Sequence, residues 1–132
     1  MIAVDTSALL HVAFAEPGHR ESVATLLERS ARLVSAASVV EAQAVLASRA
    51  EEPRAALDRL LTLLRVEIVA VDAAQVDIAR EAYLTYGRAS GHPARLNYGD
   101  TFAYALARTR NVPLAFVGER FALTDLRLLR LA

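Results

Sequence analysis

The sequence predicts an α/β fold, specifically a three-layer α/β/α sandwich with a mostly parallel central sheet. Short apolar runs alternate along the chain with longer amphipathic segments, which is the pattern of strands joined by helical crossovers. Such crossovers place helices on both faces of a parallel sheet. The length of 132 residues corresponds to one domain, which we expect to span residues 1–132.

The first half of the chain contains two short apolar runs typical of strands and four stretches with helical periodicity. The strands are expected at residues 1–4 and 33–35, and the helices at residues 6–15, 20–29, 38–50 and 53–64. Pro17 and Gly18 end the first helix, and Pro53 suits the first turn of the fourth. We expect the third and fourth helices to form an exposed hairpin.

The second half continues the alternation with three strands and two helices. The strands are expected at residues 66–71, 114–117 and 126–131, and the helices at residues 73–88 and 100–110. In the run 66–71 both alternating sets of side chains are largely apolar, which predicts a strand buried on both faces. A long loop with several basic residues, 87–98, leads directly into Asp100, and loops that deliver a reactive residue often carry function.

Composition excludes several kinds of chemistry. All fifteen basic residues are arginine, so lysine-based sites are absent, and without cysteine there are no disulfides or thiolate metal sites. The formal net charge is zero, so a site for a polyanion has to be local. The chain shows no secretory signal and no apolar stretch near the ~20 residues that span a bilayer. We therefore expect a soluble, cytoplasmic protein without a membrane partner.

Three isolated carboxylates occur where an apolar strand gives way to a helix, namely Asp5, Glu41 and Asp100. Each one alone is explained by helix capping: Asp5 precedes a helix, Glu41 completes a capping box with Ser38, and Asp100 a similar box with Asn97. Capping does not require that all three follow apolar strands. Because parallel strands bring their carboxyl ends to one sheet edge, the three are predicted to converge there.

Converging carboxylates have a direct chemical consequence. Their charges repel and raise one another's pKa unless a cation neutralises them. Oxygen ligands select Mg²⁺ or Mn²⁺, and few protein ligands leave room for water and a phosphate. A metal so held activates water and stabilises the oxygens of an in-line phosphoryl displacement. The sequence thus predicts metal-dependent phosphodiester hydrolysis.

Four segments, in their order and spacing, resemble the PIN-domain ribonucleases, in particular the VapC-type toxins of bacterial toxin–antitoxin pairs. The segments are VDTSALL (4–10), SVVEAQAVL (38–46), LNYGDTFAYALA (96–107) and GERFALTDL (118–126). The resemblance covers nearly the whole chain. It implies an Mg²⁺- or Mn²⁺-dependent endoribonuclease, inhibited by a cognate VapB-like antitoxin, and a homodimer.

Residue by residue, the resemblance implies that Asp5, Glu41 and Asp100 are metal ligands, and that a hydroxyl of Thr6 or Ser7 supports the first of them. Three acids suffice for one metal ion.

The sequence departs from the family pattern in its fourth segment. Similar chains carry an acid immediately before the phenylalanine, whereas this chain has Arg120 before Phe121. Either Glu119 or Asp125 would then serve as the fourth acid, and a second metal site is in doubt.

Two further readings concern the basic loop and the overall function. Arg88, His92 and Arg95 are candidates for contacts with RNA phosphates beside Asp100, although they also suit an ordinary solvated loop. The altered fourth segment leaves an alternative, a catalytically weak PIN-like module that binds RNA or an antitoxin. A phosphatase or a phospho-acceptor receiver domain is disfavoured because the chain has no lysine.

Overall fold

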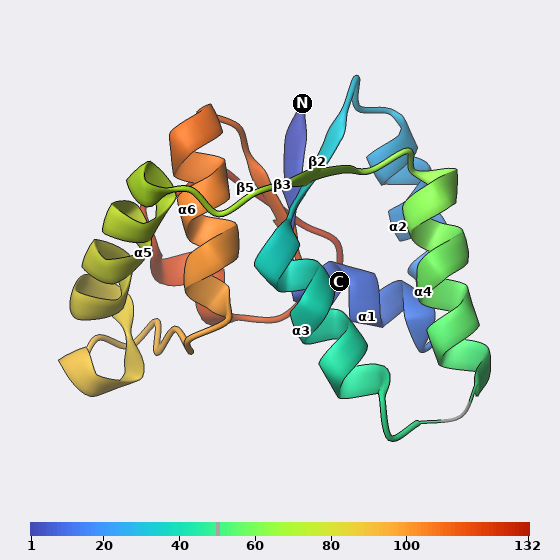
Figure 1. Cartoon of the computed structure of the whole chain (residues 1–132), viewed down its shortest axis with the longest axis horizontal. Helices are drawn as coiled ribbons and strands as arrows, with labels where there is room; N and C mark the ends of the chain where they lie inside the picture. The colour runs from blue at the N-terminus through green and yellow to red at the C-terminus, as the bar shows by residue number, and fades with distance from the viewer. Residues whose placement is uncertain (50) are drawn as a thin grey trace.

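The computed structural model describes residues 1–49 and 51–132, and its centre is a five-stranded sheet (Figure 1). The strands are β1 (Ile2–Val4), β2 (Arg32–Ser35), β3 (Glu67–Val69), β4 (Leu114–Phe116) and β5 (Leu128–Arg130). They lie in the order β3-β2-β1-β4-β5, and all four neighbouring pairs are parallel. The predicted α/β fold with a parallel sheet is confirmed.

The chain passes from β1 outward to β3 on one side, then returns to place β4 and β5 on the other side of β1. The order of strands therefore reverses between β1 and β4. In parallel sheets the crevice at such a reversal, beyond the carboxyl ends of the strands, is the usual position of a binding site.

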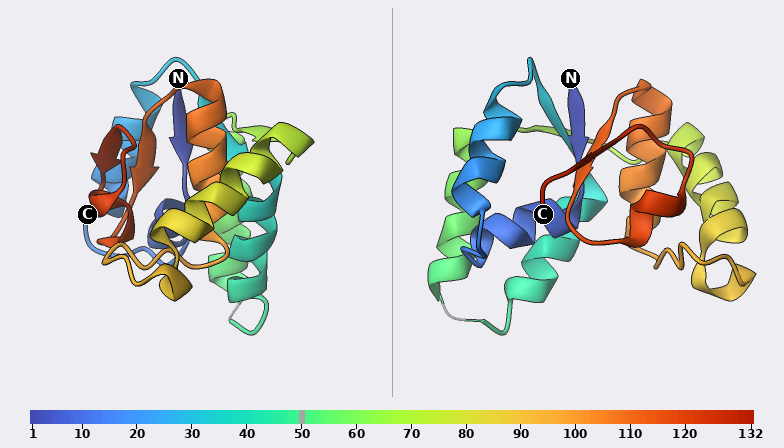
Figure 2. Two further views of the ribbon diagram at one scale, coloured as in Figure 1. Left: turned by 90° about the vertical axis from the view of Figure 1, so that its left-hand side faces the viewer. Right: turned by 180° about the vertical axis from the view of Figure 1, so that it is seen from behind.

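Helices cover both faces of the sheet (Figures 1 and 2). They are α1 (Thr6–Ala13), α2 (His19–Leu27), α3 (Ala36–Leu46), α4 (Glu51–Leu63), α5 (Ala73–Tyr86) and α6 (Asp100–Arg110), with short 3-10 helices η1 (Arg88–Ser90) and η2 (Arg120–Leu123). Because strand side chains alternate between faces, Ile2 and Val4 pack in one core with α1 to α4, whereas Ala3 packs in the other with α5 and α6.

Two expectations about exposure were wrong. Residues 66–71 were expected to be buried on both faces, but β3 is the edge strand of the sheet and Ile68 is 55% exposed. The α3 and α4 pair is not an exposed hairpin, because Leu46, Leu57 and Leu60 pack in the core that includes α1. The predicted end of the third helix, Ala50, lies outside the described residues.

The basic loop before α6 is fastened to the end of α5. Leu96 is fully buried, its amide donates to the carbonyl of Tyr86 at 2.9 Å, and its carbonyl accepts from the amide of Arg88 at 3.1 Å. These two hydrogen bonds fix the position of Leu96, four residues before Asp100, and therefore the position at which α6 begins.

None of the helices in the described part of the chain has the length and apolar character that crossing a bilayer requires.

Candidate functional site

Asp5 lies at the reversal of strand order, directly after β1 and at the N-cap of α1. Its backbone amide donates to the carbonyl of Ala115 on β4 at 3.0 Å, which joins the ends of the two strands. Its Oδ2 accepts from the amide of Ser7 at 3.0 Å, which is the predicted capping contact. Capping uses one carboxylate oxygen and leaves the other for a different role.

That second oxygen, Oδ1 of Asp5, is buried and has no hydrogen-bond partner among the described residues. The whole residue is only 2% exposed. Burial raises the pKa of Asp5 to about 6, against the effect of the hydrogen bond from Ser7, and the charges of Asp100 and Glu41 raise it further. A buried oxygen of this kind is stabilised by a proton, a water molecule or a cation.

Asp100 starts α6 and takes part in a reciprocal capping box with Asn97. The Asn97 amide donates to Oδ2 of Asp100 at 2.9 Å, and the Asp100 amide donates to Oδ1 of Asn97 at 2.8 Å. The same Oδ2 pairs with Nε of Arg120 at 2.7 Å. Burial raises the pKa of Asp100, whereas the Asn97 amide and the charges of Arg120 and Arg88 oppose that rise.

Glu41 does not form the capping box that was expected with Ser38. The helix α3 begins at Ala36 with Ser35 as its N-cap, so Ser38 lies inside the helix and is buried. The carboxylate of Glu41 instead lies against the backbone of Gly99, where any Cβ atom would overlap it. Glu41 therefore reaches toward the start of α6 from the opposite side of the site.

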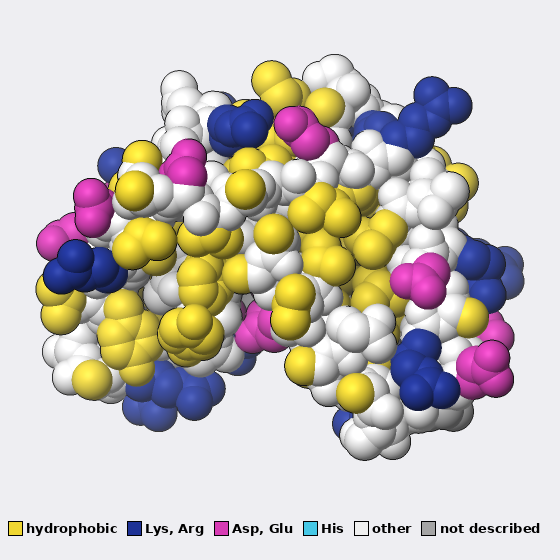
Figure 3. Space-filling view, in the orientation of Figure 1, with side chains coloured by type: hydrophobic (Ala, Val, Ile, Leu, Met, Phe, Trp, Pro, Cys, Tyr) yellow, Lys and Arg dark blue, Asp and Glu magenta, His cyan; other side chains and the backbone are white. Residues whose placement is uncertain are grey.

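The structure brings the three predicted carboxylates near one another, from the end of β1, the middle of α3 and the start of α6. Across residues 1–49 and 51–132, however, no three His, Cys, Asp or Glu side chains are gathered closely enough to hold a metal ion as they stand. In the space-filling view the lower edge of the molecule is hollowed between the α5–α6 part and the α3–α4 part, with acidic atoms at the top of the hollow and basic side chains on its left rim (Figure 3).

The residues present fit a hard divalent cation. The donors are all carboxylate oxygens, and the buried Oδ1 of Asp5 has no competing partner in the described part of the chain. Gly99 carries no side chain where Glu41 approaches. Asp5 and Asp100 are held by helix-start hydrogen bonds, so of the three residues that would hold such a cation Glu41 is the one whose carboxylate is fixed by no hydrogen bond among the described residues.

The two hydroxyls expected to support Asp5 make other contacts. Thr6 Oγ1 donates to the carbonyl of Ser38 at 3.3 Å, and Ser7 Oγ accepts from the amide of Val117 at 3.0 Å. They fasten the start of α1 to α3 and to the end of β4. Ser7 also supports Asp5 as expected, because both its side chain and its backbone amide lower the pKa of Asp5 against the effect of burial.

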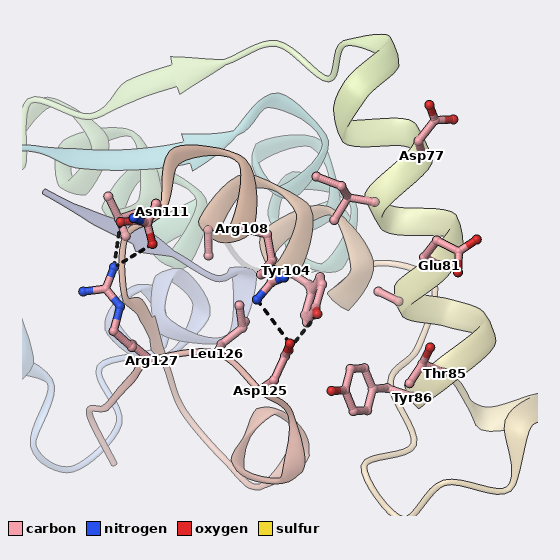
Figure 4. Close-up of a pocket in the computed structure, with 14 residues that line it drawn as sticks. Asp77, Glu81, Thr85, Tyr86, Tyr104, Arg108, Asn111, Asp125, Leu126 and Arg127 are labelled. Atoms are coloured by element: carbon pink, nitrogen blue, oxygen red, sulfur yellow. Dashed lines mark hydrogen bonds and ion pairs between the residues drawn. The ribbon is translucent and has the colours of Figure 1, made fainter.

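The two candidates for a fourth acid are engaged elsewhere. Glu119 is 88% exposed and pairs with Nη2 of Arg130 at 2.9 Å. Asp125 accepts from the hydroxyl of Tyr104 at 2.7 Å and from Nη1 of Arg108 at 3.2 Å, in a pocket of about 720 Å³ that α5, α6 and the C-terminal segment line (Figure 4). The structure joins neither carboxylate to the cluster.

Arginines form a second part of the site. Arg88 and Arg95, two of the three predicted RNA contacts, line a pocket of about 420 Å³ together with Arg120. Arg88 and Arg120 also act electrostatically on Asp100, so the pocket adjoins the carboxylates. We name this cavity, which the side chains of Arg88, Arg95 and Arg120 line, the arginine pocket. It offers positive charge, suited to an anion, beside the carboxylate of Asp100.

His92, the third predicted RNA contact, is turned into its own loop. Its ring packs edge-on against Tyr86 with 4.9 Å between ring centroids, and its Nδ1 accepts from the amide of Ala94 at 3.0 Å. These contacts give His92 a role in holding the loop. The sequence did not predict a role for Arg120 in the site. The feature that could have indicated one is its position before Phe121, where similar chains carry an acid.

The fold is thus a parallel α/β sheet with the carboxylates of Asp5 and Asp100 beyond its strand reversal and arginines beside them, a donor set that fits a cation next to an anion. The profile of the PIN domain family matches residues 2–126. Ribonuclease VapC42 of Mycobacterium tuberculosis is 44% identical over 127 residues, which cover 94% of this chain and 95% of that protein. Ribonuclease VapC of Mycolicibacterium smegmatis is 44% identical over 94% of this chain and 96% of that protein.

Solved structures agree on the fold. VapBC2 from Rickettsia felis, bound to a DNA fragment from its promoter, superposes with a TM-score of 0.77 at 18% identity and covers 98% of each chain. The chain belongs to the PIN domain family and, within it, to the VapC ribonucleases.

Proposed function

We propose that this chain is an Mg²⁺- or Mn²⁺-dependent endoribonuclease that hydrolyses RNA phosphodiester bonds, with Asp5, Glu41 and Asp100 as metal ligands. Membership of the VapC ribonucleases supports the reaction. The observation that carries the metal site is the buried Oδ1 of Asp5, which lacks a partner in the described chain and lies within the field of two further carboxylates.

In this proposal the carboxylates bind the metal ion and the arginines bind the RNA. Asp5 and Asp100 are held by the first turns of their helices and present fixed oxygens, and Glu41 closes from α3. When bound, the metal ion supplies positive charge to the phosphate oxygens and lowers the pKa of water. Arg88 and Arg95 bind the RNA backbone on the flank of the site and orient the scissile bond.

We also propose the partners that the family implies. The Rickettsia felis relative is a VapBC assembly, which supports control of this chain by a cognate VapB-like antitoxin. Val40 and Tyr98 are large apolar side chains that are more than two thirds exposed and line one groove together, which supports a homodimer or a protein partner. RNA as the substrate supports action in the cytoplasm.

The test is cleavage of structured RNAs by the purified chain, freed of any co-purifying partner. The arms contain Mg²⁺, Mn²⁺ or EDTA, with wild type, Asp5→Asn and Asp72→Asn. Asp72 is a matched control because it caps α5 in the same way, with its Oδ1 accepting from the Gln75 amide, but it lies outside the site.

We expect cleavage by wild type and Asp72→Asn that EDTA abolishes, and none by Asp5→Asn. Full activity of Asp5→Asn, or equal cleavage in EDTA, would contradict the assigned metal site. Tight RNA binding without cleavage in either metal would instead indicate the weakly catalytic binding module.

A further inference from the structure

Arg120 occupies the position where the family pattern has an acid, and it contacts a proposed metal ligand. Its Nε lies 2.7 Å from Oδ2 of Asp100. The side chain of Asp100 is only 4% exposed, whereas that of Arg120 is 45% exposed. The guanidinium therefore reaches from solvent to a buried carboxylate, which is a charge-assisted contact of the stronger kind.

This contact limits what Asp100 can bind. Its Oδ2 already receives the amide of Asn97 at 2.9 Å and the guanidinium of Arg120. An oxygen with two donors is a poor ligand for a further cation, and the positive guanidinium repels one nearby. Oδ1 of Asp5, by contrast, is buried and has no hydrogen-bond partner in residues 1–49 and 51–132.

The rest of the Arg120 side chain faces the arginine pocket. Arg120, Arg88 and Arg95 line it, and the acid on its rim, Glu119, is paired with Arg130. Among the residues that the structure describes, Arg120 makes no ion pair other than the one with Asp100. Its terminal Nη groups are thus available to a phosphate that enters the pocket.

We propose that Arg120 is the second cation of this site: its guanidinium neutralises Asp100, binds an RNA phosphate next to the scissile bond, and restricts the chain to one divalent ion. The inference rests on the proposed function. A fourth acid at this position would bind a second metal ion. In this arrangement the guanidinium of Arg120 supplies that positive charge instead. Arg120 acts on substrate directly and on the metal through Asp100.

The first measurement is Mn²⁺ binding to the full chain in the absence of RNA, by calorimetry and electron paramagnetic resonance, at about pH 8, where Asp5 is ionised. We expect one Mn²⁺ for wild type. Arg120→Gln removes a positive charge a few ångströms from the ligands, so its Mn²⁺ affinity should rise by about tenfold or more. Arg120→Lys keeps the charge and should remain near wild type.

The second measurement is the affinity for a short labelled RNA in EDTA across a salt series. Arg120→Gln should bind more weakly, with a salt dependence reduced by ~0.7 in the logarithmic slope, as expected for one lost phosphate contact on a single strand. Arg80→Gln is the matched control because Arg80 is an exposed arginine on α5, paired only weakly with Asp77. Arg80→Gln should leave the affinity for Mn²⁺ and the affinity for RNA unchanged.

The outcomes separate this inference from the proposed function. If wild type binds no Mn²⁺, the metal-dependent function fails and the inference with it. If wild type binds two Mn²⁺, or if Arg120→Gln leaves the affinity for Mn²⁺ or for RNA unchanged, only the role of Arg120 is overturned. If Arg120→Gln lowers the melting temperature but leaves the affinities for Mn²⁺ and for RNA unchanged, the role of Arg120 is purely structural and the inference is also overturned.

Discussion

Replacing Asp5 by asparagine is expected to stabilise the metal-free protein, although it removes a proposed metal ligand. The amide oxygen of asparagine still accepts from the Ser7 amide, and asparagine caps a helix about as well as aspartate. The neutral side chain no longer places a negative charge in a buried position near Asp100 and Glu41. The site would lose its function and the fold would gain stability.

The magnitude follows from the pKa of Asp5, which burial raises from 3.8 to about 6. At about 1.4 kcal/mol for each pKa unit, the ionised carboxylate destabilises the folded state by about 3 kcal/mol. Because the folded state holds the proton more tightly, the contribution of Asp5 to stability is complete below pH 3.8 and is lost as the pH rises through about 6.

The attraction between the carboxylate and the hydrogen-bond donors at the start of α1 is already included in that pKa, because the hydrogen bonds from Ser7 lower it. The expected net gain in the free energy of unfolding for Asp5→Asn is therefore about 3 kcal/mol at about pH 8. At acidic pH, where Asp5 is protonated in both states, the variant and wild type should have nearly equal stability.

The assay is urea unfolding in EDTA at a series of pH values, with Asp72→Asn as the control for loss of an exposed capping carboxylate. The advantage of Asp5→Asn should grow between about pH 4 and pH 6 and then level off. Saturating Mn²⁺ should reverse the order, because only wild type gains stability from binding. Wild type that is more stable than Asp5→Asn in EDTA above pH 6 would refute the reasoning.

Three other substitutions test neighbouring parts of the site. Gly99→Ala suits the helical backbone there but displaces the Glu41 carboxylate, so Mn²⁺ affinity should fall roughly tenfold in calorimetry, while an unchanged affinity would remove Glu41 from the ligand set. Arg95→Gln should weaken RNA binding equally for different RNA sequences, and a sequence-selective loss in fluorescence anisotropy would contradict a phosphate contact. Glu119→Gln should leave Mn²⁺ binding and cleavage unchanged, and a marked loss of either would make Glu119 a ligand after all.

Much of the fold was predictable because its signals are local. The helix from Asp100 to Arg110 has the bounds that its periodicity predicts, and its capping box with Asn97 forms as the spacing indicates. The strand before Asp5 is likewise a local apolar run that ends at a capping residue. These features depend on contacts between residues only a few positions apart.

Predictions that depended on packing were less successful. Glu41 was compatible with a cap at Ser38, but the helix begins earlier, at Ala36 with Ser35 as its N-cap, because β2 continues directly into α3. Ile68 has the apolar pattern of a central strand, yet β3 is the last strand on its side of the sheet. Local pattern does not specify which strand becomes an edge, because sheet order is set by long-range pairing.

The sequence by itself determined the succession of strands and helices and placed an acid after β1 and at the start of α6, since hydrophobic periodicity and capping are properties of neighbouring residues. The tertiary structure alone decided that strand order reverses beside Asp5, that Glu41 lies against Gly99, and that Arg120 pairs with Asp100. These contacts join residues 20 or more positions apart, and they exist only because the packed sheet and helices bring the chain segments together.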